Sequence, residues 1–227
     1  MEPTSLCDRL MDYFESHQGK QKKGTSGAGM NLGYKNSTDI SVSPNEISLP
    51  GNEVFEEYFK SLFDCHKDYI AQWPFLEAFA KNLEIGKFNL QRYQSGEHFS
   101  LLHTERSSLS TLHRLLAWMT YLNDVDVDNG GSTSFSHYGV EVQPRKGLTL
   151  IWPAEWTHAH RGQVVQEGSK YIITGWMHFP KWTDLELSEK RYSLNIHRIR
   201  YEDLVLDMKL EVSSLLRFLE LDWENQQ

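Results

Sequence analysis

Apolar residues recur at helical spacing in two segments near the start of the chain. The first is residues 4–16, and the second runs from Glu53 to about Gln72 and carries a broad apolar stripe. Pro74 follows the second segment and predicts its end, because proline lacks a backbone N–H and clashes with the preceding turn. The pattern predicts two amphipathic helices, followed by a shorter helix or turn over residues 75–82.

The remaining pattern is that of loops and short strands. Residues 18–50 are rich in Gly, Ser, Asn and Lys and predict a long extended or loop segment. From Phe88 onward, short apolar runs alternate with turn residues such as Gly130-Gly131 and Gly168. Eight strands are predicted: 88–94, 98–105, 112–122, 132–136, 140–143, 147–152, 157–163 and 169–178. Eight such strands predict a mainly β fold, a sandwich or jelly roll, with the flanking helices packed against one sheet.

The end of the chain predicts one more helix, over residues 207–220 after a polar segment. One face of this helix carries leucines, which is typical of packing against the rest of the chain or against a partner subunit. Both alternatives stay open, so a homo-oligomer is a candidate assembly. Three segments are predicted: residues 1–84 with the N-terminal helices and linker, 85–180 with the β domain, and 181–227 as a C-terminal tail.

Composition narrows the class of protein. Its 227 residues can form one substantial core, and the 12% aromatic content favours a β-rich one. A net charge of −8 argues against nucleic acid as the main partner, and no apolar run approaches the roughly 20 residues of a membrane span. Cys7 and Cys65 form no CxxC pair, and the polar N-terminus lacks the apolar region of a signal peptide, so we expect a cytoplasmic protein.

The first candidate chemistry is the pair His103 and Glu105. Alternate residues of a strand point to the same face, so this imidazole and carboxylate can reach one metal ion together. They are two thirds of the two-histidine, one-carboxylate set of non-haem Fe(II) oxygenases, so the third ligand is expected to be a histidine from another strand. His-x-Glu on its own is a weak signal, because such pairs are common on protein surfaces.

A second stretch supplies the missing ligand. We interpret residues 157–176 as two strands joined by a tight loop, so that a hairpin centred near Val165 places His160 opposite Lys170. A histidine and a lysine on one face suit a five-carbon diacid that spans a metal and a cation, and a buried lysine requires an anion. For His158 an ordinary polar or supporting role is favoured, whereas His160 is the predicted ligand.

Together these residues resemble the 2-oxoglutarate/Fe(II)-dependent oxygenase superfamily, in its prolyl-4-hydroxylase-like branch. The matching motifs span about residues 85–180, in the order of the family. They are Tyr93 and Gly96, His103-x-Glu105, Tyr121-Leu122-Asn123, Gly130-Gly131-x-Thr133-x-Phe135, Pro144-x-x-Gly147, and His160 followed ten residues later by Lys170. The chain departs from the family at two points: a glutamate replaces the usual aspartate, and one extra residue separates Gly96 from His103.

The resemblance implies a double-stranded β-helix, a cupin-like jelly roll, that binds Fe(II) and the cosubstrate 2-oxoglutarate. Ascorbate is a candidate further cofactor. His103, Glu105 and His160 are the implied metal ligands and catalytic centre. The implied cosubstrate contacts are Lys170 and Tyr121 at the C5 carboxylate, Tyr93 near the metal and the C1 end, and Thr174 and Trp176 along the pocket.

The implied reaction is hydroxylation of a substrate by O2, with release of succinate and CO2. The substrate stays open between peptidyl proline, an amino acid and a small metabolite, because the predicted substrate-facing loops carry no readable signature. The alternative is a non-catalytic jelly-roll binding module. Residues 199–221 resemble the C-terminal Tyr-Glu-Asp-Leu and helix segment of sulfotransferases, but no Gly-rich phosphate loop precedes them, so a fusion remnant or a packing helix is the favoured interpretation.

Overall fold

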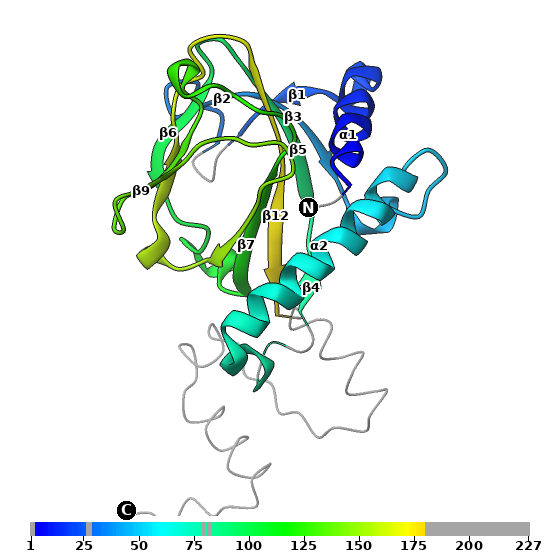
Figure 1. Cartoon of the computed structure of the whole chain (residues 1–227), viewed down its shortest axis with the longest axis vertical. Helices are drawn as coiled ribbons and strands as arrows, with labels where there is room; N and C mark the ends of the chain where they lie inside the picture. The colour runs from blue at the N-terminus through cyan, green and yellow to red at the C-terminus, as the bar shows by residue number, and fades with distance from the viewer. Residues whose placement is uncertain (1–2, 26–28, 79, 81–82, 180–227) are drawn as a thin grey trace, which may run out of the picture. The chain divides into compact units, whose positions relative to one another are not determined.

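The computed structural model describes residues 3–25, 29–78, 80 and 83–179 (Figure 1). Its two α-helices, α1 (Ser5–Ser16) and α2 (Glu53–Gln72), coincide closely with the two predicted amphipathic helices. Short 3-10 helices cover Gln18–Lys20, Pro44–Glu46, Pro74–Ala78, Leu109–Thr111, Val127–Asn129 and Trp156–His158. Among the described residues, no helix has the length and apolar character needed to cross a membrane.

Two antiparallel sheets form the body of the fold. The seven-stranded sheet runs in the order β1 (Lys22–Lys23), β3 (Thr38–Val42), β5 (Phe88–Gln94), β12 (Ser169–His178), β7 (Arg114–Tyr121) and β10 (Thr149–Pro153), with β4 (Glu84–Ile85) paired to β12. The five-stranded sheet runs in the order β2 (Lys35–Asn36), β6 (His98–His103), β11 (His160–Gly162), β8 (Thr133–Phe135) and β9 (Val140–Val142). The predicted mainly β jelly roll is confirmed.

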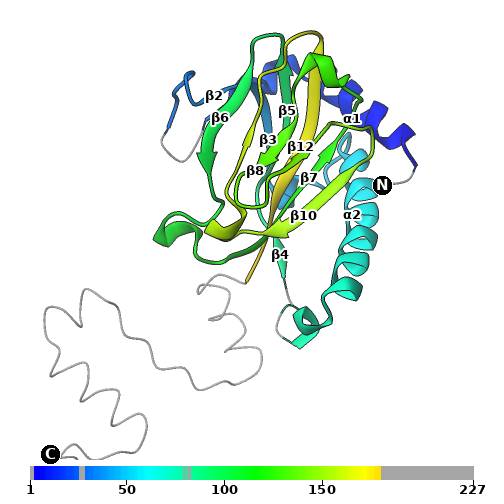
Figure 2. The ribbon, with the colours of Figure 1, turned by 60° about the vertical axis from the view of Figure 1, so that its left-hand side comes forward.

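The helices cover the outer face of the seven-stranded sheet, and both views show them on the side away from β6 (Figures 1 and 2). The apolar stripe of α2 explains this packing, because Phe55, Tyr58 and Leu62 are buried in one cluster with side chains of β3, β5, β7 and β12. Trp118 lies in this cluster, fully buried, with the Tyr58 and Phe59 rings at 5.6 and 5.9 Å. The inner face of the same sheet is left for the site.

Strand β3 lies in a segment that the sequence predicts as extended or loop. Its Gly- and Ser-rich surroundings hide the signal of a strand, and pairing with β5 along five residues stabilises it. The predicted strand 157–163 is shorter than expected, because a 3-10 helix occupies Trp156–His158 and only His160–Gly162 pairs.

The predicted hairpin between β11 and β12 is wrong. His160 pairs with His103 of β6 and Phe135 of β8, whereas Lys170 pairs with Tyr93 of β5, in the other sheet. The connection crosses between the sheets, and Val165 at its middle is fully buried and bonds through its backbone to Gly96 and Glu97. The prediction assumed that the two strands pair with each other, and residues lie opposite one another on one face only when their strands are neighbours in one sheet.

The predicted helix 207–220 and the sulfotransferase-like residues 199–221 lie outside the described residues. The division of the chain at residues 84 and 180, the cytoplasmic location and the homo-oligomer stay predictions.

Candidate functional site

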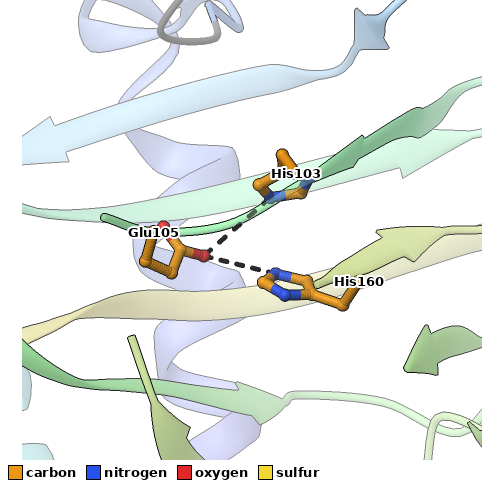
Figure 3. A group of neighbouring side chains, drawn as sticks. All are labelled: His103, Glu105 and His160. Atoms are coloured by element: carbon orange, nitrogen blue, oxygen red, sulfur yellow. Dashed lines mark ion pairs between the residues drawn. The ribbon is translucent and has the colours of Figure 1, made fainter. Parts of the chain in front are cut away.

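Three side chains, from the neighbouring strands β6 and β11 and from the segment that follows β6, converge on one point (Figure 3). His103 ends β6, Glu105 follows two residues later, and His160 begins β11, directly opposite His103 in the β6–β11 pairing. Oε1 of Glu105 lies 3.2 Å from Nε2 of His160 and 3.9 Å from Nε2 of His103. One donor atom from each residue lies within 4.8 Å of the other two, so a single ion can contact all three.

Backbone carbonyls fix the orientation of both imidazoles. Nδ1 of His103 lies 2.8 Å from the carbonyl oxygen of Leu101, and Nδ1 of His160 lies 2.9 Å from that of His158. A carbonyl oxygen only accepts, so each Nδ1 carries the proton and each Nε2 presents its lone pair to the centre. His158 therefore supports the site through its main chain, while its imidazole contacts Thr157 Oγ1 at 3.0 Å.

The charges of the three groups suit a divalent cation. Burial, together with the neighbouring His160, lowers the pKa of His103 to about 4. Burial alone would raise the pKa of the Glu105 carboxyl, but the adjacent imidazoles of His160 and His103 and a hydrogen bond from Trp176 hold it at about 2. The centre thus offers two imidazole nitrogens and one carboxylate, which is the donor set that Fe(II) oxygenases use with coordination positions left open. The residues present fit the iron that the sequence predicts.

The centre opens into a cavity of about 1020 Å³ between the two sheets. Alternate residues of β12 line it, because every second side chain of a strand points to the same face. These inward residues are Lys170, Ile172, Thr174 and Trp176. His160 and Lys170 thus line one cavity, but from the two facing sheets rather than from paired strands of one hairpin.

Lys170 is a buried amine whose described partners are uncharged. The side chain is 3% exposed, and its Nζ donates to the carbonyl oxygen of Gly131 at 2.8 Å and lies 4.6 Å from the centre of the Tyr93 ring. Burial lowers the pKa of Lys170 to about 7. An ammonium group in such surroundings is strongly favoured by a bound anion.

Of the two tyrosines, Tyr93 lines the cavity and Tyr121 contacts a residue that lines it. The Tyr93 ring packs at Lys170, and its hydroxyl donates to Gln91 Oε1 at 2.8 Å. Tyr121 is fully buried and is not one of the described residues that line the cavity. Its hydroxyl donates a hydrogen bond at 2.6 Å to Oγ1 of Thr133, which does line the cavity. Direct contacts of Tyr93 and Tyr121 with a cosubstrate stay predictions.

Trp176 and Arg114 hold the carboxylate of Glu105. The indole Nε1 of Trp176 donates to Glu105 Oε2 at 2.7 Å, and the Arg114 guanidinium lies 3.6 Å from the centre of the Trp176 ring and donates to the Glu105 carbonyl oxygen at 2.9 Å. These contacts fix a side chain that is one methylene longer than the usual aspartate. Sequence reasoning missed Arg114, whose only signal is a charged residue at the start of an apolar strand.

We expect Trp176→Phe to weaken divalent metal binding about tenfold, the lower end of what losing a bond to a metal ligand costs. Phenylalanine keeps an aromatic ring for Arg114 but removes the N–H that Glu105 accepts, together with part of the indole. Isothermal titration with Mn(II) measures the change, with Trp73→Phe as the control because Trp73 is exposed and far along the chain from the centre. An unchanged Kd in Trp176→Phe would show that the indole does not position Glu105.

Comparison with known proteins identifies relatives of this fold and site. Residues 88–178 match the family model of the 2OG-Fe(II) oxygenase superfamily. The chain is 29% identical over 180 residues to procollagen-lysine,2-oxoglutarate 5-dioxygenase 1 of Gallus gallus, and 30% identical over 178 residues to the Homo sapiens protein of the same name. These alignments cover 76% and 75% of this chain, which spans about a fifth of the length of either relative (22% in both).

Solved structures with a similar fold include two prolyl hydroxylases. A prolyl-4-hydroxylase of Pseudomonas putida aligns with a TM-score of 0.59 at 18% identity, covering 78% of this chain and 86% of that one. A prolyl hydroxylase of Trichoplax adhaerens, solved with a hypoxia inducible factor peptide fragment, aligns with a TM-score of 0.58 at 17% identity, covering 84% and 83%. At these identities the likeness establishes the fold alone.

Proposed function

We propose that the chain is an Fe(II)- and 2-oxoglutarate-dependent hydroxylase of the 2OG-Fe(II) oxygenase superfamily, whose family model matches residues 88–178. The observation that carries the proposal is the convergence of His103, Glu105 and His160 on one point, in a cavity that also contains the buried amine of Lys170. A metal-binding set and an anion-binding group that share one cavity are what a cosubstrate with two acidic ends requires.

Each residue of the site has a separate task in the proposed reaction. When loaded, the iron centre supplies the chemistry by which 2-oxoglutarate, O2 and a substrate C–H group yield succinate, CO2 and a C–OH group. His103, Glu105 and His160 hold the metal and leave positions open for ligands. Lys170 binds the far carboxylate of 2-oxoglutarate and thereby orients its near end towards the metal.

Burial of the site limits the access of water. The described wall of the cavity includes the apolar side chains of Phe99, Met119, Trp152 and Ile172. A low-polarity wall strengthens the interactions of charged groups inside the cavity and restricts the open metal positions to bound ligands. Ascorbate as a further cofactor stays a prediction.

We propose a side chain of a polypeptide as the substrate, with lysine tested first and proline second. Lysyl hydroxylases are the curated relatives, and prolyl hydroxylases share the fold. The cavity mouth supports a macromolecular substrate, because Leu102 and Trp156 line it while 49% and 68% exposed, and Leu109 beside it is 87% exposed. Exposed apolar side chains around an opening are typical of contacts with another chain.

The test is anaerobic titration of the purified chain with Fe(II) and then 2-oxoglutarate, followed by admission of O2 with lysine- and proline-containing peptides. We expect a weak visible absorption band when 2-oxoglutarate chelates the iron, and one succinate released per peptide that gains one oxygen atom. Mass spectrometry of the peptide identifies the residue. An iron-loaded chain that neither binds nor consumes 2-oxoglutarate would favour the alternative of a non-catalytic binding module.

A further inference from the structure

A second lysine is buried at the same cavity, in a place that the proposed reaction does not explain. Lys35, from strand β2, is 4% exposed and lines the cavity together with Lys170. Its Nζ lies 2.7 Å from Oδ2 of Asp39, a carboxylate that is itself buried. Burying such a pair is costly and does not by itself favour folding, so its place beside an anion-binding cavity calls for a further role.

Asp39 is the centre of a hydrogen-bond network that leads to Lys170. Besides Lys35, the carboxylate accepts bonds from Ser37 Oγ at 2.7 Å and from Gln91 Nε2 at 3.1 Å. Gln91 in turn accepts a hydrogen bond from the Tyr93 hydroxyl. The ammonium of Lys170 lies over the Tyr93 ring in a cation–π contact. The network thus connects the carboxylate of Asp39, through Gln91 and Tyr93, to the ring that the ammonium of Lys170 contacts.

Lys35 also reaches the metal end of the cavity. Its Nζ lies 5.4 Å from the centre of the Phe99 ring, and that ring stacks on His103 with the centroids 4.0 Å apart and the planes at 16°. The pairing of Lys35 with Phe99 in strands β2 and β6 fixes this arrangement. The lysine thus lies between the two ends of the cavity, with its charge directed at Asp39.

We propose that Lys35 is a positioning residue that neutralises Asp39 and so keeps the lysine end of the cavity able to accept a carboxylate. This rests on the proposed function. Two carboxylates near one another in a buried site repel strongly, because the low polarity of the interior screens charge poorly. With Lys35 in place, Asp39 is compensated and Lys170 remains as the cation that the far carboxylate of 2-oxoglutarate meets.

The test compares three variants by isothermal titration of the Mn(II)-loaded chain with 2-oxoglutarate, which measures binding without turnover. Lys35→Met leaves Asp39 uncompensated and is expected to raise the Kd about tenfold, which corresponds to about 1.4 kcal/mol. Asp39→Asn removes the repelling charge, so its Kd is expected to stay at or below that of the unaltered chain. The double variant Lys35→Met/Asp39→Asn removes both charges and is expected to return the Kd to within about threefold.

A purely structural role predicts a different pattern. If the pair only braces the fold, all three variants lose it, and all three would bind 2-oxoglutarate equally weakly, which would overturn the proposal. So would a Kd in Lys35→Met within about threefold of the unaltered chain. Should Lys35→Met fail to fold, the other two variants decide: weakened binding in both contradicts the proposal, and unweakened binding in both supports it.

Lys146→Met is the matched control, because Lys146 pairs with Asp8 in an exposed ion pair outside the cavity. Its Kd is expected to be unchanged. The two hypotheses fail separately. An unaltered chain that binds no 2-oxoglutarate in the presence of Mn(II) contradicts the proposed function, whereas a chain that binds it but shows no rescue in the double variant contradicts only the role of Lys35.

Discussion

His160→Ala is expected to reduce divalent metal affinity at least about a hundredfold, beyond what the loss of an outer hydrogen-bond partner costs. The variant removes one of the three donors that converge at the centre, and the Nε2 of His160 is the one nearest to the carboxylate of Glu105, at 3.2 Å. The remaining imidazole and carboxylate are a weaker and less selective set. Titration with Mn(II), together with the iron content after anaerobic reconstitution, measures the loss.

His158→Ala is the matched control, since it removes a histidine two residues away and leaves the backbone intact. Its carbonyl oxygen still accepts the Nδ1 proton of His160, so metal affinity is expected to stay within about threefold of the unaltered chain. If His158→Ala lost the metal and His160→Ala kept it, the ligand assignment would be reversed. Thermal melting of both variants without metal separates this effect from misfolding.

The sequence predicted those elements whose pattern is long and regular. The apolar stripe of α2 and the apolar run of β12 are strong local signals, and their observed bounds, Glu53–Gln72 and Ser169–His178, match the predicted ones. Residues His103 and Glu105 were predicted to act together because strand geometry brings alternate residues to one face. In each case a few neighbouring residues contain the whole signal.

Contacts between distant segments were beyond such reasoning. The pairing of His160 with His103 joins residues 57 positions apart and depends on β11 crossing to the smaller sheet, which no local pattern marks. The proposed role of Lys35 is hidden for the same reason, because its segment has a loop-like composition and Asp39 is linked to Gln91 only when β3 pairs with β5. Local propensity cannot predict an element that tertiary pairing stabilises.

Lys170→Met is expected to raise the Kd of 2-oxoglutarate at least about a hundredfold. The variant leaves the far carboxylate of 2-oxoglutarate buried against apolar side chains without a cation to pair with. Methionine has a similar length and keeps the packing against the Tyr93 ring, so the loss reports the charge and its hydrogen bonds. Metal affinity in the absence of 2-oxoglutarate is expected to be unchanged. Titration with Mn(II), and then titration of the Mn(II)-loaded chain with 2-oxoglutarate, measure the two dissociation constants. A Kd for 2-oxoglutarate in Lys170→Met within about threefold of that of the unaltered chain would contradict the proposed role of Lys170 in binding the far carboxylate.

The pH dependence of binding supplies a second and independent signature of Lys170. Burial lowers the pKa of this amine to about 7 in the free chain, and a bound carboxylate must raise it, since it favours the ammonium form. Below pH 7 the amine is already charged, and binding needs no proton. Above pH 7 each binding event takes up a proton, so the Kd rises by up to about tenfold per pH unit until the pKa of the complex is reached. Calorimetry at pH 8 in buffers of different ionisation enthalpy should detect this uptake, and it should disappear in Lys170→Met; uptake that persists in the variant would assign the proton to another group.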